Sequence, residues 1–391
     1  MNRLCPICSS EKTKPFFEIK NMPIFIGVLY PDQESALNCP RGDIQLSFCM
    51  NCGFIWNSLF DADRLEYSTT YDNSLHFSPF YDNYASQTAK SLVERYSIHD
   101  AHIIEIGCGK GDFLIHLCKH GSNHGTGFDP SFEERGIDGK ISDRVTFIRD
   151  AYSSRYAHIR GDLICSRYVL EHIQDPLNFL RMLRDNVARE NTVIYFEVPN
   201  ADFIFSNLSI WDIIYEHCSY FTSAALTYLF RACSFKVLEV EAVYGSQYIR
   251  IEAVPGDNFE TDVKQGHFNG LRVRDENILN FPVEFENKIA EYKYVLRNIG
   301  RKNKKTVPWG AGAKGVSFLN MLDIGNEIKY VVDVNPHKHG KYIPGTGQKI
   351  VSPHFIKAIQ PDTVIIMNPI YEEEIRSEIF SMGVNTEIIK V

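Results

Sequence analysis

The sequence predicts an α/β protein with a small cysteine-rich module at the N-terminus, a central Rossmann-like domain and a second Rossmann-like domain at the C-terminus. Two CxxC pairs stand within the first 52 residues, and apolar runs alternate with amphipathic stretches from His102 onward. This alternation restarts after a charged helical stretch that ends near Lys305. A chain of 391 residues is also too long for one domain of ordinary size.

The composition excludes several classes of partner. The formal charge is −8, and acidic and basic residues are interspersed, so no basic stripe is present that would neutralise nucleic-acid phosphates. The first residues, MNRLCPICSSEK, lack the apolar core of a signal peptide, and no later apolar run reaches the length of a membrane helix. We therefore expect a cytoplasmic protein with no nucleic-acid partner and no membrane partner.

The four N-terminal cysteines have the spacing of a metal site. Cys5 and Cys8 lie in CPIC, and Cys49 and Cys52 lie in CMNCG. Two residues between cysteines let one tight turn direct both sulfurs at a tetrahedral ion, and four sulfurs leave no open position, so we predict a structural zinc. The alternatives are unrelated free thiols, a redox CxxC and a zinc ribbon that binds nucleic acid. The acidic balance disfavours the last of these.

The pattern along the chain divides it into units. Up to about residue 65 the sequence is irregular and short of periodicity, which is why it needs a metal to fold. The segments HIIEIG, GTGFD, DLICS and TVIYFEVP read as buried strands, and FLIHLCKH and PLNFLRMLRDNV read as helices between them, which together predict a parallel sheet. TVPW, IKYVVDVN and DTVIIMN repeat the pattern near the end. The expected units are residues 1–66, 67–256, a helical connector at 257–305, and 306–391.

A glycine-rich turn follows the first of these strands. IIEIGCGKGDF places three glycines where backbone amides can approach a ligand, and Asp129 ends the next strand, where a carboxylate can accept ribose hydroxyls. Asp150 ends a third strand and is a candidate for the adenine amino group. An NAD site would use the same pattern, so the glycines alone do not decide between cofactors. The candidate glycines are Gly107, Gly109 and Gly111.

The IGCGKG form and the later SRYVLEHIQDP stretch resemble the S-adenosylmethionine-dependent methyltransferases. The resemblance implies that Glu105 meets the amino group of the cofactor's methionine moiety. It also implies that the SRYVLEH stretch runs beneath the cofactor, so that Arg167, Tyr168 and His172 face the reaction chamber. For His172 a local hydrogen bond at a helix start is the alternative.

Taken in order, CPIC, CMNCG, EIGCGKG, LEHIQD, YEHCSYFT and VVDVNPHKHGKYIPGT resemble the zinc-binding sugar C-methyltransferases that act on nucleotide-linked 4-keto deoxysugars. The resemblance covers nearly the whole chain. It implies a class I methyltransferase domain, S-adenosylmethionine as methyl donor, a structural zinc, and a C-terminal Rossmann-like domain that completes the cleft for the sugar nucleotide.

The resemblance also assigns the chemistry. A histidine removes the proton beside the ketone, and the resulting enolate attacks the methyl group; the family's EH pair maps onto Glu216 and His217. His217 is then the base, Glu216 orients its ring or binds a sugar hydroxyl, and His172 lies near the ketone. Tyr220, in the same string, is a candidate for substrate contact. The alternative is that EHCSYF is a turn packed by Tyr220 and Phe221.

The match departs from the family just ahead of this pair, where Ile214 and Tyr215 replace the usual tyrosine and histidine. Tyr215 is our candidate to replace the missing tyrosine. Upstream, Tyr67, Tyr71, Ser74 and Tyr81 lie in a segment that supplies one active-site tyrosine in the family, and we select Tyr71. Aromatic packing of the zinc module against the central domain is the alternative.

In the C-terminal domain, GAGAKG presents Gly310, Gly312 and the Lys314 ammonium group to an anion such as a pyrophosphate. The expected reaction is methylation at carbon 3 of a nucleotide-linked 4-keto-6-deoxysugar, with carbon 5 and the nucleotide left open. Two other functions remain: O- or N-methylation of a sugar or small metabolite, and a non-catalytic zinc-containing binding protein. The presence of Glu105, Asp129 and the Glu216–His217 pair together disfavours the last one.

Overall fold

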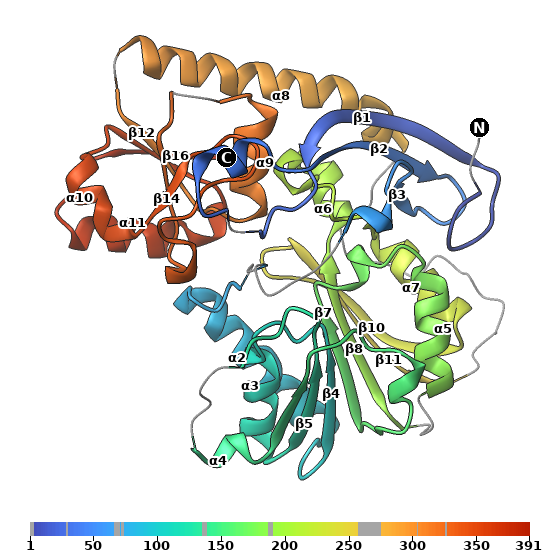
Figure 1. Cartoon of the computed structure of the whole chain (residues 1–391). Helices are drawn as coiled ribbons and strands as arrows, with labels where there is room; N and C mark the ends of the chain where they lie inside the picture. The colour runs from blue at the N-terminus through green and yellow to red at the C-terminus, as the bar shows by residue number, and fades with distance from the viewer. Residues whose placement is uncertain are drawn as a thin grey trace.

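The structure is a computed structural model that describes residues 4–28, 30–65, 71, 74–134, 139–186, 191–256, 275–302, 304–324 and 327–391. These residues form three sheets, with the N-terminal and C-terminal sheets lying beneath one long helix and the central sheet below them (Figure 1). Tyr67, the predicted boundary at 66/67 and the start of the predicted connector at 257–274 lie outside the described residues.

The N-terminal module contains an antiparallel sheet in the order β1-β2-β3-β9. Its helical elements are α1 (Gln33–Leu37) and the 3-10 turn η1 (Ala62–Arg64). Our expectation of an irregular segment was therefore wrong. Register shifts interrupt the pairing of β1 with β2 at two places, so the period-two alternation that marks a strand is broken along β1. The strands are β1 (Thr13–Pro23), β2 (Arg41–Cys49), β3 (Ile55–Asn57) and β9 (Ser219–Tyr220).

Strand β9 comes from the middle of the chain and pairs with β3 of the N-terminal module. Ile55 lies opposite Tyr220, and the Asn57 N–H donates to the Cys218 carbonyl at 3.0 Å. The module therefore holds the backbone directly after the Glu216–His217 pair.

The central sheet has the order β10-β11-β8-β7-β4-β5-β6. The strands from β8 to β6 are parallel, as predicted, and β11 and β10 add an antiparallel edge. The strands are β4 (His102–Ile106), β5 (His124–Phe128), β6 (Val145–Ile148), β7 (Leu163–Arg167), β8 (Val193–Pro199), β10 (Phe235–Val243) and β11 (Tyr248–Pro255).

Strand order reverses beside β4, which pairs with β5 on one side and β7 on the other. In open α/β sheets a ligand crevice lies at the carboxyl ends of the strands at such a point. The helices of this domain are α2 (Pro79–Tyr96), α3 (Asp112–Gly121), α4 (Gly139–Ser142), α5 (Pro176–Asn186), α6 (Ala201–Ser206) and α7 (Ser223–Ala232). Short 3-10 turns join them: η2 (Ser154–Tyr156), η3 (Leu170–His172) and η4 (Ile210–Asp212).

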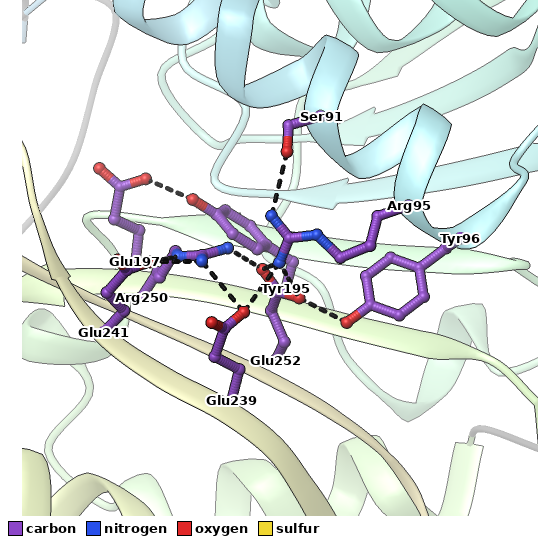
Figure 2. Close-up of polar contacts among 9 residues, drawn as sticks. All are labelled: Ser91, Arg95, Tyr96, Tyr195, Glu197, Glu239, Glu241, Arg250 and Glu252. Atoms are coloured by element: carbon purple, nitrogen blue, oxygen red, sulfur yellow. Dashed lines mark hydrogen bonds and ion pairs between the residues drawn. The ribbon is translucent and has the colours of Figure 1, made fainter. Parts of the chain in front are cut away.

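An ion-pair network fastens α2 to the antiparallel edge of this sheet (Figure 2). The side chain of Glu252 on β11 is fully buried, and Arg95 of α2 donates to it at 2.7 Å. Arg95 also pairs with Glu239 at 2.9 Å, and Arg250 pairs with the same carboxylate at 3.0 Å. A buried carboxylate needs such partners, since leaving it unpaired would cost several kcal/mol, on the order of 3–5.

The C-terminal domain is a parallel sheet in the order β14-β13-β12-β15-β16. Its strands are β12 (Thr306–Trp309), β13 (Tyr330–Val332), β14 (Lys349–Val351), β15 (Thr363–Ile366) and β16 (Glu387–Lys390). Its helices and turns are α9 (Ala313–Met321), η5 (Pro336–Lys338), η6 (Pro353–Phe355), α10 (Ile356–Ile359), η7 (Pro369–Tyr371) and α11 (Glu372–Ser381).

Helix α8 (Asp275–Arg301) runs along the N-terminal and C-terminal units (Figure 1). Phe281 and Phe285 on α8 are buried against Phe17 of β1, with ring centroids 5.1 and 4.7 Å away. One continuous cluster of buried side chains extends from there into the C-terminal domain. The helix thus joins two units through one core. Among the described residues, no helix has the length and apolar character needed to cross a membrane.

Candidate active site

A cavity of about 600 Å³ lies between the central and C-terminal domains. One wall is the glycine turn after β4, and the opposite wall is the GAGAKG loop after β12. The cavity therefore lies at the reversal of strand order in the central sheet and continues to the corresponding end of the C-terminal sheet.

The three glycines of the first turn, Gly107, Gly109 and Gly111, all have positive φ, at 72°, 54° and 84°. Their surroundings differ. A Cβ on Gly107 would collide with the side chain of Val169, so this position is needed for packing. A Cβ on Gly109 would meet nothing within 4 Å, and Gly109 lines the cavity, so here the open space is the cavity itself. Gly111 is the N-cap of α3, packs against Phe147 and lies off the cavity wall.

Glu105 and Asp129 bring carboxyl groups to this end of the cavity. Glu105 is buried, its Oε2 has no hydrogen-bond partner among the described residues, and burial raises its pKa to about 8. Such a group fits a ligand that brings a positive charge, because the charge compensates the burial of the carboxylate. Asp129 accepts the Gly109 N–H at 2.8 Å and the Ser131 N–H at 2.7 Å, which fixes its carboxylate at the cavity edge.

Two predicted cofactor residues have other partners. Asp150 accepts the Tyr156 hydroxyl at 2.7 Å and pairs with Arg155 at 2.8 Å, and it is not on the cavity wall. Arg167 does line the cavity, but its guanidinium group donates to the buried Glu197 at 3.1 Å and to Tyr81 at 2.9 Å. Arg167 therefore lies on the cavity wall with its guanidinium group already paired, and Asp150 is paired outside the cavity lining.

Four of the five predicted catalytic residues lie on the cavity wall. His172 ends η3, and His217 stands just before β9; their ring centroids are 5.0 Å apart. A ring nitrogen of His172 contacts the Glu216 carbonyl at 3.0 Å. The Tyr71 hydroxyl donates to the Glu216 carboxyl at 3.3 Å. All four residues line the cavity, and among the upstream tyrosines that the structure describes, Tyr71 makes the hydrogen bond to the EH pair.

Burial shifts the titration of these groups toward their neutral forms. It raises the pKa of Glu216 to about 8 and lowers the pKa of His172 to about 4. Burial, followed by the neighbouring His172, lowers the pKa of His217 well below its usual value. Both imidazoles are therefore neutral near pH 7, the form that accepts a proton.

Two predicted residues are not in the site. Tyr215 packs against Gly42, and its hydroxyl accepts the Asp61 N–H at 3.2 Å. The Tyr220 hydroxyl is bound by the backbone of Ile214, at 3.1 and 3.2 Å. Neither residue lines the cavity, and both belong to a cluster of buried side chains, although the Tyr220 ring lies 6.1 Å from the His217 ring. The pairing of β9 with the N-terminal sheet turns these side chains into the core.

The C-terminal wall includes Gly312 and Lys314, as predicted. Gly312 is the N-cap of α9. The Lys314 ammonium group forms an ion pair with Asp212 and a hydrogen bond to the Ser209 hydroxyl at 3.2 Å, both from the central domain. The Lys314 ammonium group thus lies on the cavity wall with its charge balanced by Asp212.

Sequence reasoning missed several residues of the cavity wall. Gln247 and Asn368 form a reciprocal amide pair across the two domains, at 2.9 and 3.0 Å. Glu171, in the same LEH string as His172, is buried on the wall with an unpartnered Oε2. Its position beside a predicted site histidine was the one signal available in the sequence.

The four N-terminal cysteines come together as predicted. Their sulfurs all lie within 4.8 Å of one another, with Cys5 and Cys52 at 3.6 Å and Cys8 and Cys49 at 3.5 Å. Sulfurs at about 2.3 Å from a tetrahedral zinc ion would lie about 3.8 Å apart. The geometry thus fits a four-thiolate site.

Comparisons with known proteins agree with this arrangement. Residues 81–240 match the model of a methyltransferase domain, and residues 273–385 match the model of a C-methyltransferase C-terminal domain. A curated relative, C-methyltransferase NovU from Streptomyces niveus, is 24% identical over 303 residues, which cover 72% of this chain and 70% of the relative.

Among solved structures, an O-methyltransferase family protein from Burkholderia thailandensis matches with a TM-score of 0.34 and 11% identity over 46% of this chain and 59% of its own. The 1,6-didemethyltoxoflavin-N1-methyltransferase of the same organism matches with a TM-score of 0.34 and 16% identity over 46% of this chain and 81% of its own. The chain thus carries a methyltransferase domain followed by a C-methyltransferase C-terminal domain, and it is similar over most of its length to a C-methyltransferase.

Proposed function

We propose that the enzyme methylates a carbon of a nucleotide-linked 4-keto-6-deoxysugar, at carbon 3. The observation that supports this most directly is the shared cavity. His217, His172 and Glu216 face the same space as Gly109 and Glu105 of the cofactor turn. Carbon methylation needs a base beside the methyl donor, and this cavity supplies one.

S-adenosylmethionine supplies an electrophilic methyl group when bound, and we assign its methionine ammonium group to Glu105 and its ribose to Asp129. His217 takes the proton from the carbon beside the ketone. The electron pair of that C–H bond moves onto the ketone oxygen, and His172 lies at hand to stabilise the enolate. Glu216, held by Tyr71, binds a sugar hydroxyl. The enolate carbon then forms the new bond to the methyl group, and the C–S bond breaks.

The nucleotide part of the substrate is assigned to the C-terminal wall. The N-terminus of α9 at Gly312 presents backbone N–H groups to an anion, and Lys314 lies on the same wall. A pyrophosphate there would compete with Asp212 for the Lys314 ammonium group. Binding between the two domains would also exclude water from the enolate.

The metal in this proposal is a structural zinc held by the four cysteines. Its site has no free coordination position for a substrate. Through β3 and β9 the same module supports the loop of His217. The zinc would thus act on catalysis only by holding that backbone.

Mass spectrometry of the purified protein in heavy water tests the proposal. The protein is incubated with S-adenosylmethionine and a panel of TDP- and GDP-linked 4-keto-6-deoxysugars. A product heavier by one CH2 unit identifies the nucleotide, and solvent deuterium at one carbon of the remaining unmethylated substrate identifies the position that loses its proton. His217→Ala should lower turnover by about 100-fold or more without weakening cofactor binding. Turnover of a 4-hydroxy analogue by the wild type would refute the carbon assignment.

A further inference from the structure

Glu171 brings a second carboxyl group to the base, in addition to Glu216. A carboxylate oxygen of Glu171 and one ring nitrogen from each of His172 and His217 all lie within 4.8 Å of one another. Glu216, although adjacent in sequence to His217, accepts the Tyr71 hydroxyl through Oε2. Sequence adjacency thus favours Glu216 as the carboxyl partner of His217, whereas the spatial cluster favours Glu171.

Two polar atoms in this cluster lack a partner. Oε2 of Glu171 and Nδ1 of His217 are both buried and make no hydrogen bond with the described residues. A buried donor or acceptor left unpaired costs roughly 1–3 kcal/mol. One is a carboxyl oxygen and the other an imidazole nitrogen, so a single hydrogen bond between them would satisfy both.

The backbones that carry the two side chains are already joined. The Cys218 thiol donates to the Glu171 carbonyl at 3.3 Å, and a ring nitrogen of His172 contacts the Glu216 carbonyl at 3.0 Å. These contacts tie η3 to the loop before β9. The two side chains therefore come from backbones that are held side by side, with a carboxylate oxygen and a ring nitrogen within 4.8 Å of each other.

We propose that Glu171 is the positioning residue of the base: its carboxylate accepts the Nδ1–H of His217, which leaves the unprotonated Nε2 facing the substrate. The inference rests on the proposed function, because it concerns the same proton transfer. The substrate C–H bond breaks, its proton moves to Nε2 and its electron pair to the ketone oxygen. The carboxylate then balances the charge of the imidazolium ion.

Burial favours the neutral form of both groups while they are unpaired. Burial raises the pKa of Glu171 to about 8 and lowers that of His217. Each charge alone is costly in this wall, whereas a hydrogen bond to the charged form of each group offsets the cost.

The tautomer of His217 tests the inference without any substrate. In ¹⁵N NMR of the full-length protein labelled at histidine, the His217 signals are those missing from His217→Ala. The wild type should carry the proton on Nδ1, and Glu171→Gln should move it to Nε2, because the amide can donate to Nδ1. The same tautomer in both proteins would overturn the inference even if the proposed function holds.

Kinetics supply the second test. Glu171→Gln should lower kcat by about 100-fold or more while the KM for the sugar and the affinity for S-adenosylmethionine change by less than about 3-fold. Glu171→Asp keeps the charge and should recover part of the activity. In a His217→Ala background Glu171→Gln should have no further effect; equal effects in both backgrounds would show that Glu171 acts independently of the base.

Discussion

Gly107 and Gly109 both line the cavity, but alanine substitutions at the two positions should differ in their effect on packing. Alanine at either position must adopt a left-handed backbone, which costs roughly 1–2 kcal/mol. At Gly107 the added methyl group also collides with Val169, and overpacking costs roughly a further 1–3 kcal/mol. Gly107→Ala should therefore destabilise the protein by about 2–5 kcal/mol and Gly109→Ala by only about 1–2 kcal/mol.

The Gly109 substitution should also act on cofactor affinity. The methyl group of Gly109→Ala enters the cavity, since nothing lies within 4 Å of it, and should weaken S-adenosylmethionine binding by about 10-fold or more, or at least 1.4 kcal/mol. Thermal unfolding without ligand measures the first effect and titration calorimetry the second. Wild-type affinity in Gly109→Ala would refute the assignment of this turn to the cofactor. Wild-type stability in Gly107→Ala would refute the packing argument.

Three further outcomes are expected. Cys49→Ser should abolish bound zinc, measured by atomic spectroscopy, and should lower both thermal stability and turnover. The control variant Cys39→Ser, in the same module, should keep the metal. Zinc retained in both variants would contradict the four-cysteine site. Without ligand, the wild type should lose stability relative to Glu105→Gln as pH rises from about 4.5 to about 8. The reason is that burial raises the pKa of Glu105, so the unfolded chain releases this proton at lower pH than the folded protein does. Parallel curves of stability against pH for the two proteins would exclude this effect of Glu105. Tyr71→Phe should lower kcat by about 10-fold through loss of its hydrogen bond to Glu216 and leave cofactor affinity unchanged, so an unchanged kcat would remove Tyr71 from the mechanism.

Local spacing in the sequence was sufficient for the elements that repeat a simple pattern. The buried runs at β4, β5, β7 and β8 were predicted from apolar composition alone, and the structure confirms them as parallel strands. The CxxC spacing likewise predicted the cysteine cluster, because each turn must place two sulfurs together. Strands β1 and β2 were not foreseen, since register shifts in their pairing disturb the alternation on which strand prediction depends.

Only the tertiary structure decided which side chains reach the cavity. The loop from Ile213 to Cys218 has no periodicity, so neighbouring residues turn in directions set by the strands around them. Pairing of β9 with β3 buries Tyr215 against Gly42 and leaves Glu216 and His217 on the cavity wall.

The residues around His217 also could not be predicted from local sequence. Sequence adjacency favoured Glu216 as the carboxylate beside His217, whereas the fold brings Glu171 to it from an element more than forty residues away. The sequence by itself determined which chemical groups the protein has and which units carry them. Their pairing depended on packing between units, because contacts between residues far apart in the chain leave no local pattern.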